Sequence, residues 1–417
     1  MTRGAPRLSR RDVVARFSTS VVAIATSGCG WGRNQNAMSD IPAGSVSVRE
    51  ARFAGGAKGD GIADDTGAIQ AAIDSAPVVY LPAGTYIVSR SLILRANRRI
   101  VGAGPSTVLK KKHEQVDRLI VNAQDAIAGI VVERLTLDGN RTSDTYVQGK
   151  DGLILSHCTG AVVRDVVVRN CLNDGIIIEY GEGNRVSGCT VFGNAKDGIY
   201  CSGSRNAAID ENRSYRNSVA GIATAATAGC LVTKNVLRNN RFDILLARDS
   251  RNIRVIGNDC RSASAFVVSG ENLTGQTLNG KVYPTKPAPG WDWLYGASHC
   301  TLADNYFGGS IRLILFDDGI VSNNTCVGSR TQGLLLQGAS RNRITGNTIR
   351  DWGSGFSAIQ LANLTAVDAI PPSQGLPLRS IDNVVSGNRL TSKNEQLTIV
   401  DAGIRSKISD NPVSLIR

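Results

Sequence analysis

Three aspartates, each followed by glycine, recur at a fixed interval in the middle of the chain. Asp151, Asp174 and Asp197 keep a constant 23-residue spacing. If each interval is one layer of a stack, their carboxylates lie roughly 5 Å apart, so they raise one another's pKa or need a cation between them. Such a pair suits a general acid beside a base or nucleophile, as in retaining glycosidases. The alternative is that Asp-Gly is a favourable turn pair copied by duplication.

Two lysines lie beside this aspartate column. Lys150 directly precedes Asp151, and Lys196 directly precedes Asp197. Either amine is a candidate base for removing a proton from a sugar carbon, and Lys150 is also placed to neutralise the column. A calcium ion near Asp151, Asp174 and Asp197 would neutralise it equally well, and no other cofactor is predicted.

A carboxylate and an aromatic ring are predicted to share the outward side of neighbouring layers. The alternation of apolar residues turns Ile176 and Ile178 inward. Glu179 and Tyr200 then face outward on adjacent layers. A ring beside a carboxylate is a candidate sugar subsite, with ordinary surface as the alternative. The predicted catalytic set is Lys150, Asp151, Asp174, Glu179, Asp197 and Tyr200.

The 23-residue interval breaks between about residues 262 and 298. Long insertions in compact repeats are usually functional, and this one holds two of the four tryptophans beside an acid, as carbohydrate-binding platforms often do. A hydrophobic flap that packs on the rest of the protein is the alternative. The residues predicted to bind substrate are Lys196, Arg241, Trp291, Asp292, Trp293 and Tyr295.

Two columns of asparagine and cysteine keep the same interval. Between them run short alternating apolar segments that are too short for helices. Three short strands and three turns make one coil of a parallel β-helix, in which equivalent residues of successive coils stack. We therefore expect the asparagines to form ladders that hydrogen-bond one coil to the next. The columns are Cys171, Asn194, Asn217 and Asn240, and Cys189, Asn212, Asn235 and Asn258.

A helix is predicted over residues 65–74, where Asp65 or Thr66 supplies the cap and the apolar residues form one face. The open end of a solenoid needs such a cover, so we expect a capping helix. Residues 46–417, which include this helix, are expected to form a single all-β domain. Its expected fold is a right-handed parallel β-helix of roughly ten to twelve coils.

Composition narrows the class of protein without naming a ligand. Of 417 residues, 42% are hydrophobic and 20% charged, which excludes global disorder, and no apolar run is long enough for a transmembrane helix. The formal charge of +12 would attract a polyanion, but the arginines form no nucleic-acid stripe. The chain has nine cysteines, and the eight from Cys158 to Cys326 lack metal-ligand spacing and are expected to be buried free thiols.

The segment 1–29 resembles a twin-arginine export signal, with Arg10-Arg11 followed by a short, weakly apolar stretch. Cleavage after Ala25 and lipid attachment at Cys29 are both open. Residues 30–45 are expected to be a linker. The protein is therefore expected in the periplasm, at the cell surface or in the medium.

Segments near the amino terminus carry a family resemblance. GDGIADDTGAIQAAID at 59–74, followed by VVYLPAGTY at 78–86, resembles the start of pectate-lyase-like, single-stranded right-handed β-helix proteins. LTLDGNR at 135–141 and the later coils extend the likeness to the catalytic modules of mannuronan C5-epimerases. The resemblance implies the fold, whereas the same opening occurs in lyases, epimerases, hydrolases and phage tailspikes.

The epimerase site matches only in part. The resemblance places Lys150 and Asp197 at the family's lysine and aspartate. Residues 177–180 (IIEY) replace its D-P-H-E motif, and Val219-Ala220 replaces its Arg-His pair. The histidine that exchanges the C5 proton is therefore missing, so epimerisation by that mechanism is not expected.

These patterns favour an exported enzyme that cleaves an extended, uronate-containing polysaccharide by β-elimination. Lys150 or Lys196 would be the base and Tyr200 the acid. Glycoside hydrolysis by paired carboxylates is the alternative, and a non-catalytic glycan-binding or envelope protein is the third possibility. The protein is expected to be a monomer or a homotrimer and to have no nucleic-acid partner.

Overall fold

The computed structural model describes residues 41–123, 127–262, 294–363, 379–392 and 398–415, and four short strands between 266 and 282. The predicted export signal, Cys29 and most of the predicted linker lie outside these residues. None of the helices in the described part has the length and apolar character needed to cross a membrane.

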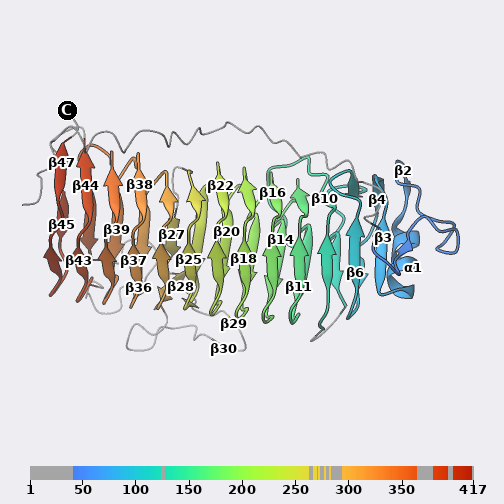
Figure 1. Ribbon diagram of the computed structural model, residues 1–417, viewed down its shortest axis with the longest axis horizontal. Coiled ribbons are helices and arrows are strands. Elements are labelled where there is room, and N and C mark those ends of the chain that lie inside the picture. The colour runs from blue at the N-terminus through green and yellow to red at the C-terminus, as the bar shows by residue number, and fades with distance from the viewer. Residues whose placement is uncertain are drawn as a thin grey trace, which may run out of the picture. The chain divides into compact units, whose positions relative to one another are not determined.

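Three long parallel sheets run side by side along the chain, and each complete coil contributes one strand to each sheet in turn (Figure 1). The fold is a parallel β-helix, as predicted. The first sheet contains β1 (Val46–Ser47), β3 (Val78–Leu81), β6 (Arg99–Gly102), β9 (Val131–Glu133), β12 (Val162–Arg164), β15 (Arg185–Ser187), β18 (Ala208–Asp210), β21 (Leu231–Thr233), β25 (Arg254–Ile256), β33 (Thr301–Ala303), β37 (Ile320–Ser322), β40 (Arg343–Thr345), β43 (Val384–Ser386) and β46 (Lys407–Ser409).

The other two long sheets follow the same order along the stack. The second sheet contains β2 (Asp60–Asp64), β4 (Gly84–Val88), β7 (Thr107–Lys111), β10 (Thr136–Asp138), β13 (Val167–Arg169), β16 (Thr190–Phe192), β19 (Arg213–Tyr215), β22 (Val236–Arg238), β26 (Asp259–Cys260), β34 (Tyr306–Phe307), β38 (Thr325–Val327), β41 (Thr348–Arg350), β44 (Arg389–Ser392) and β47 (Val413–Leu415). The third sheet contains β5 (Leu92–Leu94), β8 (Ile120–Asn122), β11 (Leu153–Ser156), β14 (Ile176–Glu179), β17 (Ile199–Ser202), β20 (Ala220–Ala225), β23 (Phe242–Ala247), β27 (Phe266–Ser269), β35 (Ile311–Ile314), β39 (Leu334–Gln337), β42 (Ile359–Ala362) and β45 (Ile399–Asp401).

Minor strands complete the description. β24 (Ser250–Arg251), β32 (Ala297–Ser298) and β36 (Phe316–Asp317) form a small parallel sheet. Two antiparallel pairs join β28 (Glu271–Asn272) to β31 (Leu294–Tyr295) and β29 (Thr277–Leu278) to β30 (Lys281–Val282).

The core is a set of apolar columns inside the coils. In the third sheet, Ile176 and Ile178 are fully buried, and the next coil places Ile199 and Cys201 opposite them. Eight cysteines of the described chain are free and buried in this way, which confirms the expected buried thiols. Burial raises the pKa of the Cys171, Cys189 and Cys326 thiols to about 12.

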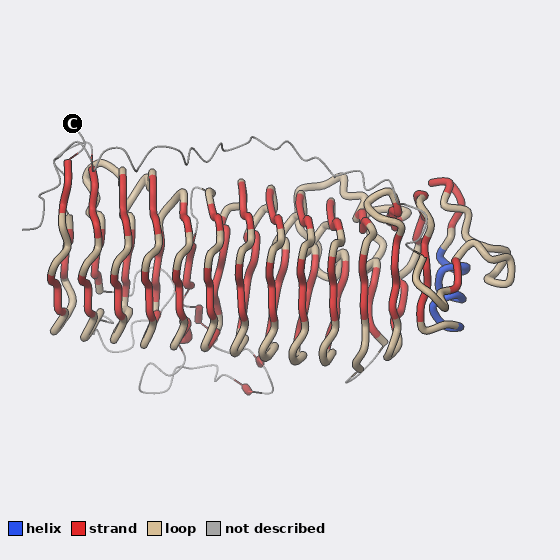
Figure 2. The backbone as a smooth tube through the Cα atoms, in the orientation of Figure 1, coloured by secondary structure: helices blue, strands red, loops and turns tan. Residues whose placement is uncertain are grey.

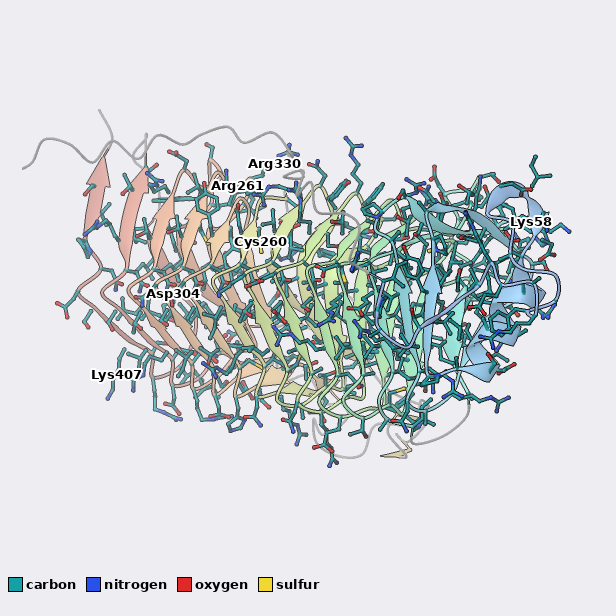
Figure 3. All side chains as sticks on the ribbon, turned by 45° about the vertical axis from the view of Figure 1, so that its right-hand side comes forward. Lys58, Cys260, Arg261, Asp304, Arg330 and Lys407 are labelled. Carbon is teal, nitrogen blue, oxygen red and sulfur yellow. The ribbon has the colours of Figure 1, made fainter. Side chains whose placement is uncertain are left out.

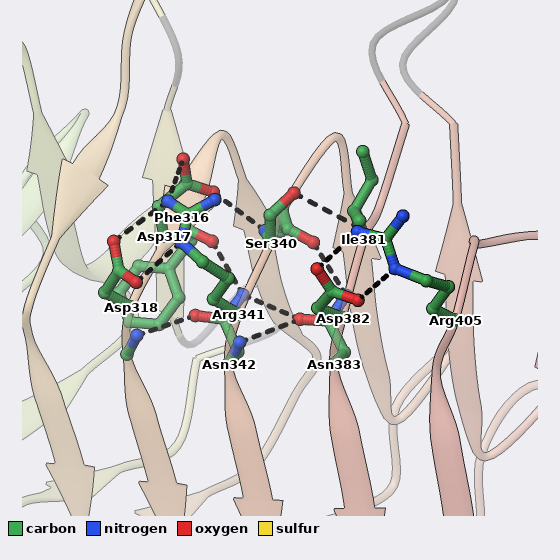
Figure 4. Close-up of polar contacts among 12 residues, drawn as sticks. Phe316, Asp317, Asp318, Ser340, Arg341, Asn342, Ile381, Asp382, Asn383 and Arg405 are labelled. Atoms are coloured by element: carbon green, nitrogen blue, oxygen red, sulfur yellow. Dashed lines mark hydrogen bonds and ion pairs between the residues drawn. The ribbon is translucent and has the colours of Figure 1, made fainter.

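The asparagine ladders are confirmed. The side-chain oxygen of each asparagine accepts hydrogen bonds from the preceding coil: the backbone amide of Asn212 donates to Asn235 Oδ1 over 2.9 Å, and that of Asn235 donates to Asn258 Oδ1 over 2.9 Å. Further along the chain, Asn342 donates to Asn383 in the same way (Figure 4). Such ladders satisfy buried turn amides that would otherwise lack partners.

The capping helix is also confirmed. α1 (Thr66–Ser75) packs against β3, β4 and β5 at the amino-terminal end of the stack and buries Ile69 and Ile73 (Figure 2). Asp65 is the N-cap residue, but its carboxylate makes no capping bond. It instead accepts backbone hydrogen bonds from Lys58 and Gly59, so it closes the preceding loop.

In the described chain the third sheet holds 12 strands and the other two hold 14 each, so the complete coils number 12, within the roughly ten to twelve predicted. Two expectations about the interval need correction. Ala220 pairs with Phe242, so the interval is one residue shorter at that step. The predicted insertion at 262–298 begins later, because Phe266–Ser269 still pairs with β23 and β35.

Candidate functional site

The aspartate column lies in the turns that lead into β11, β14 and β17 of the third sheet, on consecutive coils as predicted. It forms a ladder like the asparagine ladders but with the opposite direction, because the amide of each later coil donates to the aspartate of the coil before it. The backbone amide of Asp174 donates to Asp151 Oδ1 over 3.2 Å, and that of Asp197 donates to Asp174 Oδ1 over 2.8 Å. The Ala220 amide donates to Asp197 Oδ1 over 2.8 Å. All three aspartates are at most 3% exposed.

Two of the three carboxylates have a cationic partner. Arg118 Nε lies 3.1 Å from Asp151 Oδ2, and Lys196 Nζ lies 2.9 Å from Asp174 Oδ2. These two cations offset two of the three carboxylate charges, and the calcium ion near the column stays a prediction. In the described part of the chain, no three His, Cys, Asp or Glu side chains gather as a metal-binding group.

Asp197 is the member of the column with the weakest compensation. Burial and the charge of Asp174 raise the pKa of Asp197 to about 7, and the Lys196 ammonium offsets only part of this. Burial likewise raises the pKa of Asp174 to about 6, despite its ion pair with Lys196. Asp197 can therefore exchange a proton near neutral pH.

Lys196 connects the column to the outward face of the sheet. Its Nζ lies 4.8 Å from the centre of the Tyr200 ring as well as bonding Asp174. Burial alone would lower the pKa of Lys196, but the charges of Asp174 and Asp197 outweigh it and raise that pKa. Lys196 is therefore a cation at neutral pH.

Tyr200 lies on an apolar strip of the outward face. Its neighbours across the sheet are Ile177 and Ala223, which are 6% and 2% exposed. Burial raises the pKa of Tyr200, although the positive charges of Arg248 and Lys196 act against this. The phenol therefore keeps its proton at neutral pH and is able to donate it. We call Asp174, Lys196, Asp197 and Tyr200 the third-sheet cluster.

The other predicted site residues lie apart from this cluster. Lys150 Nζ donates to Asp117 Oδ1 over 2.7 Å and to the Gln115 carbonyl over 2.6 Å. Glu179 is half-buried at the end of β14 and pairs with Ser202 of the next coil. It is therefore two residues further along the strand than Ile177, which pairs with Tyr200. Arg241 is exposed and its guanidinium lies 5.2 Å from the centre of the Phe242 ring.

The predicted aromatic platform stays a prediction. Trp291, Asp292 and Trp293 lie outside the described residues. Tyr295 belongs to β31, for which the structure gives the backbone pairing with Glu271.

Sequence reasoning missed two arginines at the site. The separations of Arg118 from Asp151 and of Arg248 from Tyr200 are not multiples of the repeat interval, so neither arginine falls on a column. A signal for Arg118 did exist: a buried carboxylate at the first coil of the column needs a cation from the coil before it.

Comparisons with family models match two parts of the chain. Residues 53–244 match a family described as rhamnogalacturonase A/epimerase, pectate lyase-like. Residues 293–414 match a family described as periplasmic copper-binding protein (NosD).

Curated relatives resemble part of the chain. The pre-neck appendage protein of Bacillus phage phi29 is 28% identical over 287 residues, which cover 54% of this chain and 33% of that protein. Alginate lyase 7 of Azotobacter vinelandii is 31% identical over 195 residues, covering 39% of this chain and 22% of that protein. The chain thus spans a third or less of the length of these relatives.

A solved structure with the same fold is the A-module of Azotobacter vinelandii mannuronan C-5 epimerase AlgE4. It aligns with a TM-score of 0.61 over 89% of this chain and 97% of that one, at 20% identity. At this identity the likeness shows the fold alone.

Proposed function

Because the chain belongs to the pectate-lyase-like β-helix superfamily, we propose that it is an exported enzyme that cleaves a uronate-containing polysaccharide by β-elimination. One observation carries this proposal: Lys196 is held between the Asp174 carboxylate and the Tyr200 ring, beside a carboxyl group of Asp197 that titrates near neutral pH. The Arg10-Arg11 signal and the polysaccharide-acting relatives support export and substrate class.

Asp197, rather than either lysine, is the base in this proposal. Lys196 carries a raised pKa and is protonated, and Lys150 is bonded to Asp117. The ionised carboxylate of Asp197 would take the proton from C5 of the uronate.

Tyr200 and the nearby cations would complete the reaction. As the C5–H electrons form the C4–C5 double bond, the bond from C4 to the glycosidic oxygen breaks, and the Tyr200 phenol protonates that oxygen. Lys196, together with the positive field of Arg248 at Tyr200, would stabilise the charge that develops on the uronate carboxylate. Asp174 positions Lys196 through their hydrogen bond. Asp151 accepts the backbone amide of Asp174 and so holds the turn that contains Asp174.

Hydrolysis is the second candidate, and the same raised pKa of Asp197 favours it. A protonated carboxyl group near neutral pH is what a general acid requires, and Asp174 on the adjacent coil would be its partner, at roughly the 5 Å spacing of neighbouring strands. Glu179 lies farther away, because its register partner Ser202 is five residues beyond Asp197, on the order of 15 Å along the strand.

The test is an incubation with acidic and neutral polysaccharides, following ultraviolet absorbance from unsaturated uronates together with new reducing ends. Both signals rising together supports elimination, whereas reducing ends without absorbance supports hydrolysis. Asp197→Asn and Tyr200→Phe should each lower elimination at least about 100-fold, since general acids and bases contribute on that scale. The matched control, Asp304→Asn at an exposed turn, should retain it.

The pH profile separates the two reactions on the same residue. As the base, Asp197 must be ionised, so elimination should rise as pH increases through about 7. As a general acid it must be protonated, so hydrolysis should fall over the same range. Binding without turnover, unchanged by Asp197→Asn, would instead support a non-catalytic glycan-binding protein.

A further inference from the structure

The outward face of the second sheet carries a row of rings and guanidinium groups on consecutive coils. Phe192, Tyr215 and Arg238 are register partners on β16, β19 and β22. The Phe192 and Tyr215 rings stack with their centres 4.9 Å apart and their planes within 2° of parallel. All three side chains are half-buried, so each keeps an accessible surface.

A pocket of about 340 Å³ opens beside this row. Its lining combines the Tyr215 ring and the aliphatic side chain of Val236 with the guanidinium groups of three arginines. The lining residues are Arg213, Tyr215, Arg216, Val236, Arg238 and Asn239.

Cationic and aromatic side chains also lie on the next two coils of this sheet, where Tyr306 is the register partner of Asp259. Arg261 places its guanidinium 4.6 Å from the centre of the Tyr306 ring, and it projects from the outer edge of the stack (Figure 3). Asp259 lies between two arginines: Arg261 Nε is 2.8 Å from its Oδ1, and Arg238 pairs with its Oδ2. We call Phe192, Arg213, Tyr215, Arg216, Arg238, Arg261 and Tyr306 the second-sheet strip.

The strip itself holds more cationic than acidic side chains. Of its four arginines, Arg238 and Arg261 share the single carboxylate of Asp259. In the described part of the chain, Asp210 pairs with Arg185 and Glu211 pairs with Lys234, both outside the strip. An anion on this face therefore meets several guanidinium groups.

We propose that the second-sheet strip is a binding site for an anionic polysaccharide, separate from the third-sheet cluster and without chemistry of its own. Aromatic faces stack on the C–H faces of sugar rings, and guanidinium groups bind carboxylate or sulfate through paired hydrogen bonds. Because strands of successive coils are spaced about 4.8 Å apart, a strip across five coils contacts a chain of several sugars. The proposal does not depend on the reaction assigned to Asp197.

The experiment measures binding of the full chain to polygalacturonate, to dextran sulfate and to neutral dextran by isothermal titration calorimetry at two salt concentrations. The first variant is Arg213→Gln with Arg216→Gln, and the second is Tyr215→Ala, with Tyr215→Phe as the conservative rescue. Arg254→Gln is the matched control, since Arg254 is an exposed arginine on β25 of the first sheet, away from the strip.

Both strip variants should bind the polyanions roughly 10-fold more weakly, whereas Tyr215→Phe and Arg254→Gln should bind as the parent does. Added salt should weaken parent binding and narrow the gap to the arginine variant. A preference for polygalacturonate over dextran sulfate identifies carboxylate as the ligand group, and the reverse identifies sulfate.

Unchanged affinity in both variants, equal affinity for neutral dextran, or no binding of either polyanion would overturn the proposal. Turnover of short oligosaccharides should be unaffected by the strip variants. A chain that binds through the strip but lacks turnover would contradict the proposed enzyme while leaving the strip in place.

Discussion

At the scale of single residues, the three aspartates of the column differ in their partners rather than in their backbone setting. Each accepts a backbone amide from the next coil, but Arg118 pairs with Asp151 and Lys196 pairs with Asp174. Asp197 shares Lys196 only at longer range, so burial and the adjacent carboxylate raise its pKa. Functional sites commonly retain such unfavourable groups, because chemistry requires them.

Asp197→Asn should therefore stabilise the protein while removing its proposed activity. The folded-state pKa of Asp197 lies above its ordinary value of 3.8, so between pH 4 and 7 the folded chain binds more protons than the unfolded chain. Stability is thus lost as pH rises through this window. The amide keeps the acceptor for Ala220, so we expect a gain of about 1–3 kcal/mol at pH 8 and a smaller gain at pH 4.5.

Urea denaturation at both pH values measures this difference, with Asp304→Asn at an exposed turn as the control. A gain that is equal at both pH values would contradict the assigned titration, because an uncharged effect such as packing does not depend on pH.

At the scale of the coil, buried side-chain amides hold successive turns together. Asn235 is fully buried, accepts from both nitrogens of Asn212, and donates to the Ile209 carbonyl and to Asn258. A hydrophobic residue of similar size would fill the space but leave these groups unpaired. The ladder therefore explains why asparagine recurs where apolar residues surround it.

Asn235→Ala should destabilise the protein by about 2–4 kcal/mol, because it leaves buried amide and carbonyl groups without partners. The midpoint of urea unfolding measures the effect. Ser218→Ala, at an exposed turn position on the neighbouring coil, is the control and should stay within about 0.5 kcal/mol. A loss for Asn235→Ala as small as that of the control would show that the ladder contributes little.

At the scale of the molecule, the described coils share one continuous core. The ladder passes directly from Asn258 to Asn305 over 2.9 Å, although the two asparagines are far apart in the sequence. The coil pattern therefore resumes in register after the interruption. Cysteines on both sides of it, such as Cys260 and Cys326, are buried in that core.

The eight buried thiols should resist a water-soluble thiol reagent in the folded protein and react after unfolding in guanidinium. Burial removes access to all eight thiols and raises the pKa of most of them, as at Cys171 and Cys326, so the thiolate that reacts is scarce. Cys201 is the exception among the eight, because a hydrogen bond with Cys230 lowers its pKa, and its protection rests on burial alone. Ser218→Cys, which adds an exposed thiol, is the positive control. Rapid reaction of several thiols in the folded parent would contradict a single closed core.

Sequence alone was sufficient for the parallel β-helix, the capping helix, the asparagine ladders and the stacking of Asp151, Asp174 and Asp197. These follow from columns that repeat at one interval, since a repeated spacing directly places equivalent residues on neighbouring coils. It failed where the interval changes, as at the shortened step from Ala220 to Phe242.

Only the tertiary structure decided which charges meet. Arg118 and Arg248 do not follow the 23-residue spacing, so the sequence does not place them near the column. Lys196 could have paired with Asp174 or with Asp197, and the structure pairs it with Asp174. The pKa of a buried carboxyl depends on its depth and on every charge around it, and these come from several coils at once. For the same reason the second-sheet strip, whose residues are scattered through the sequence, becomes visible only when the coils are stacked.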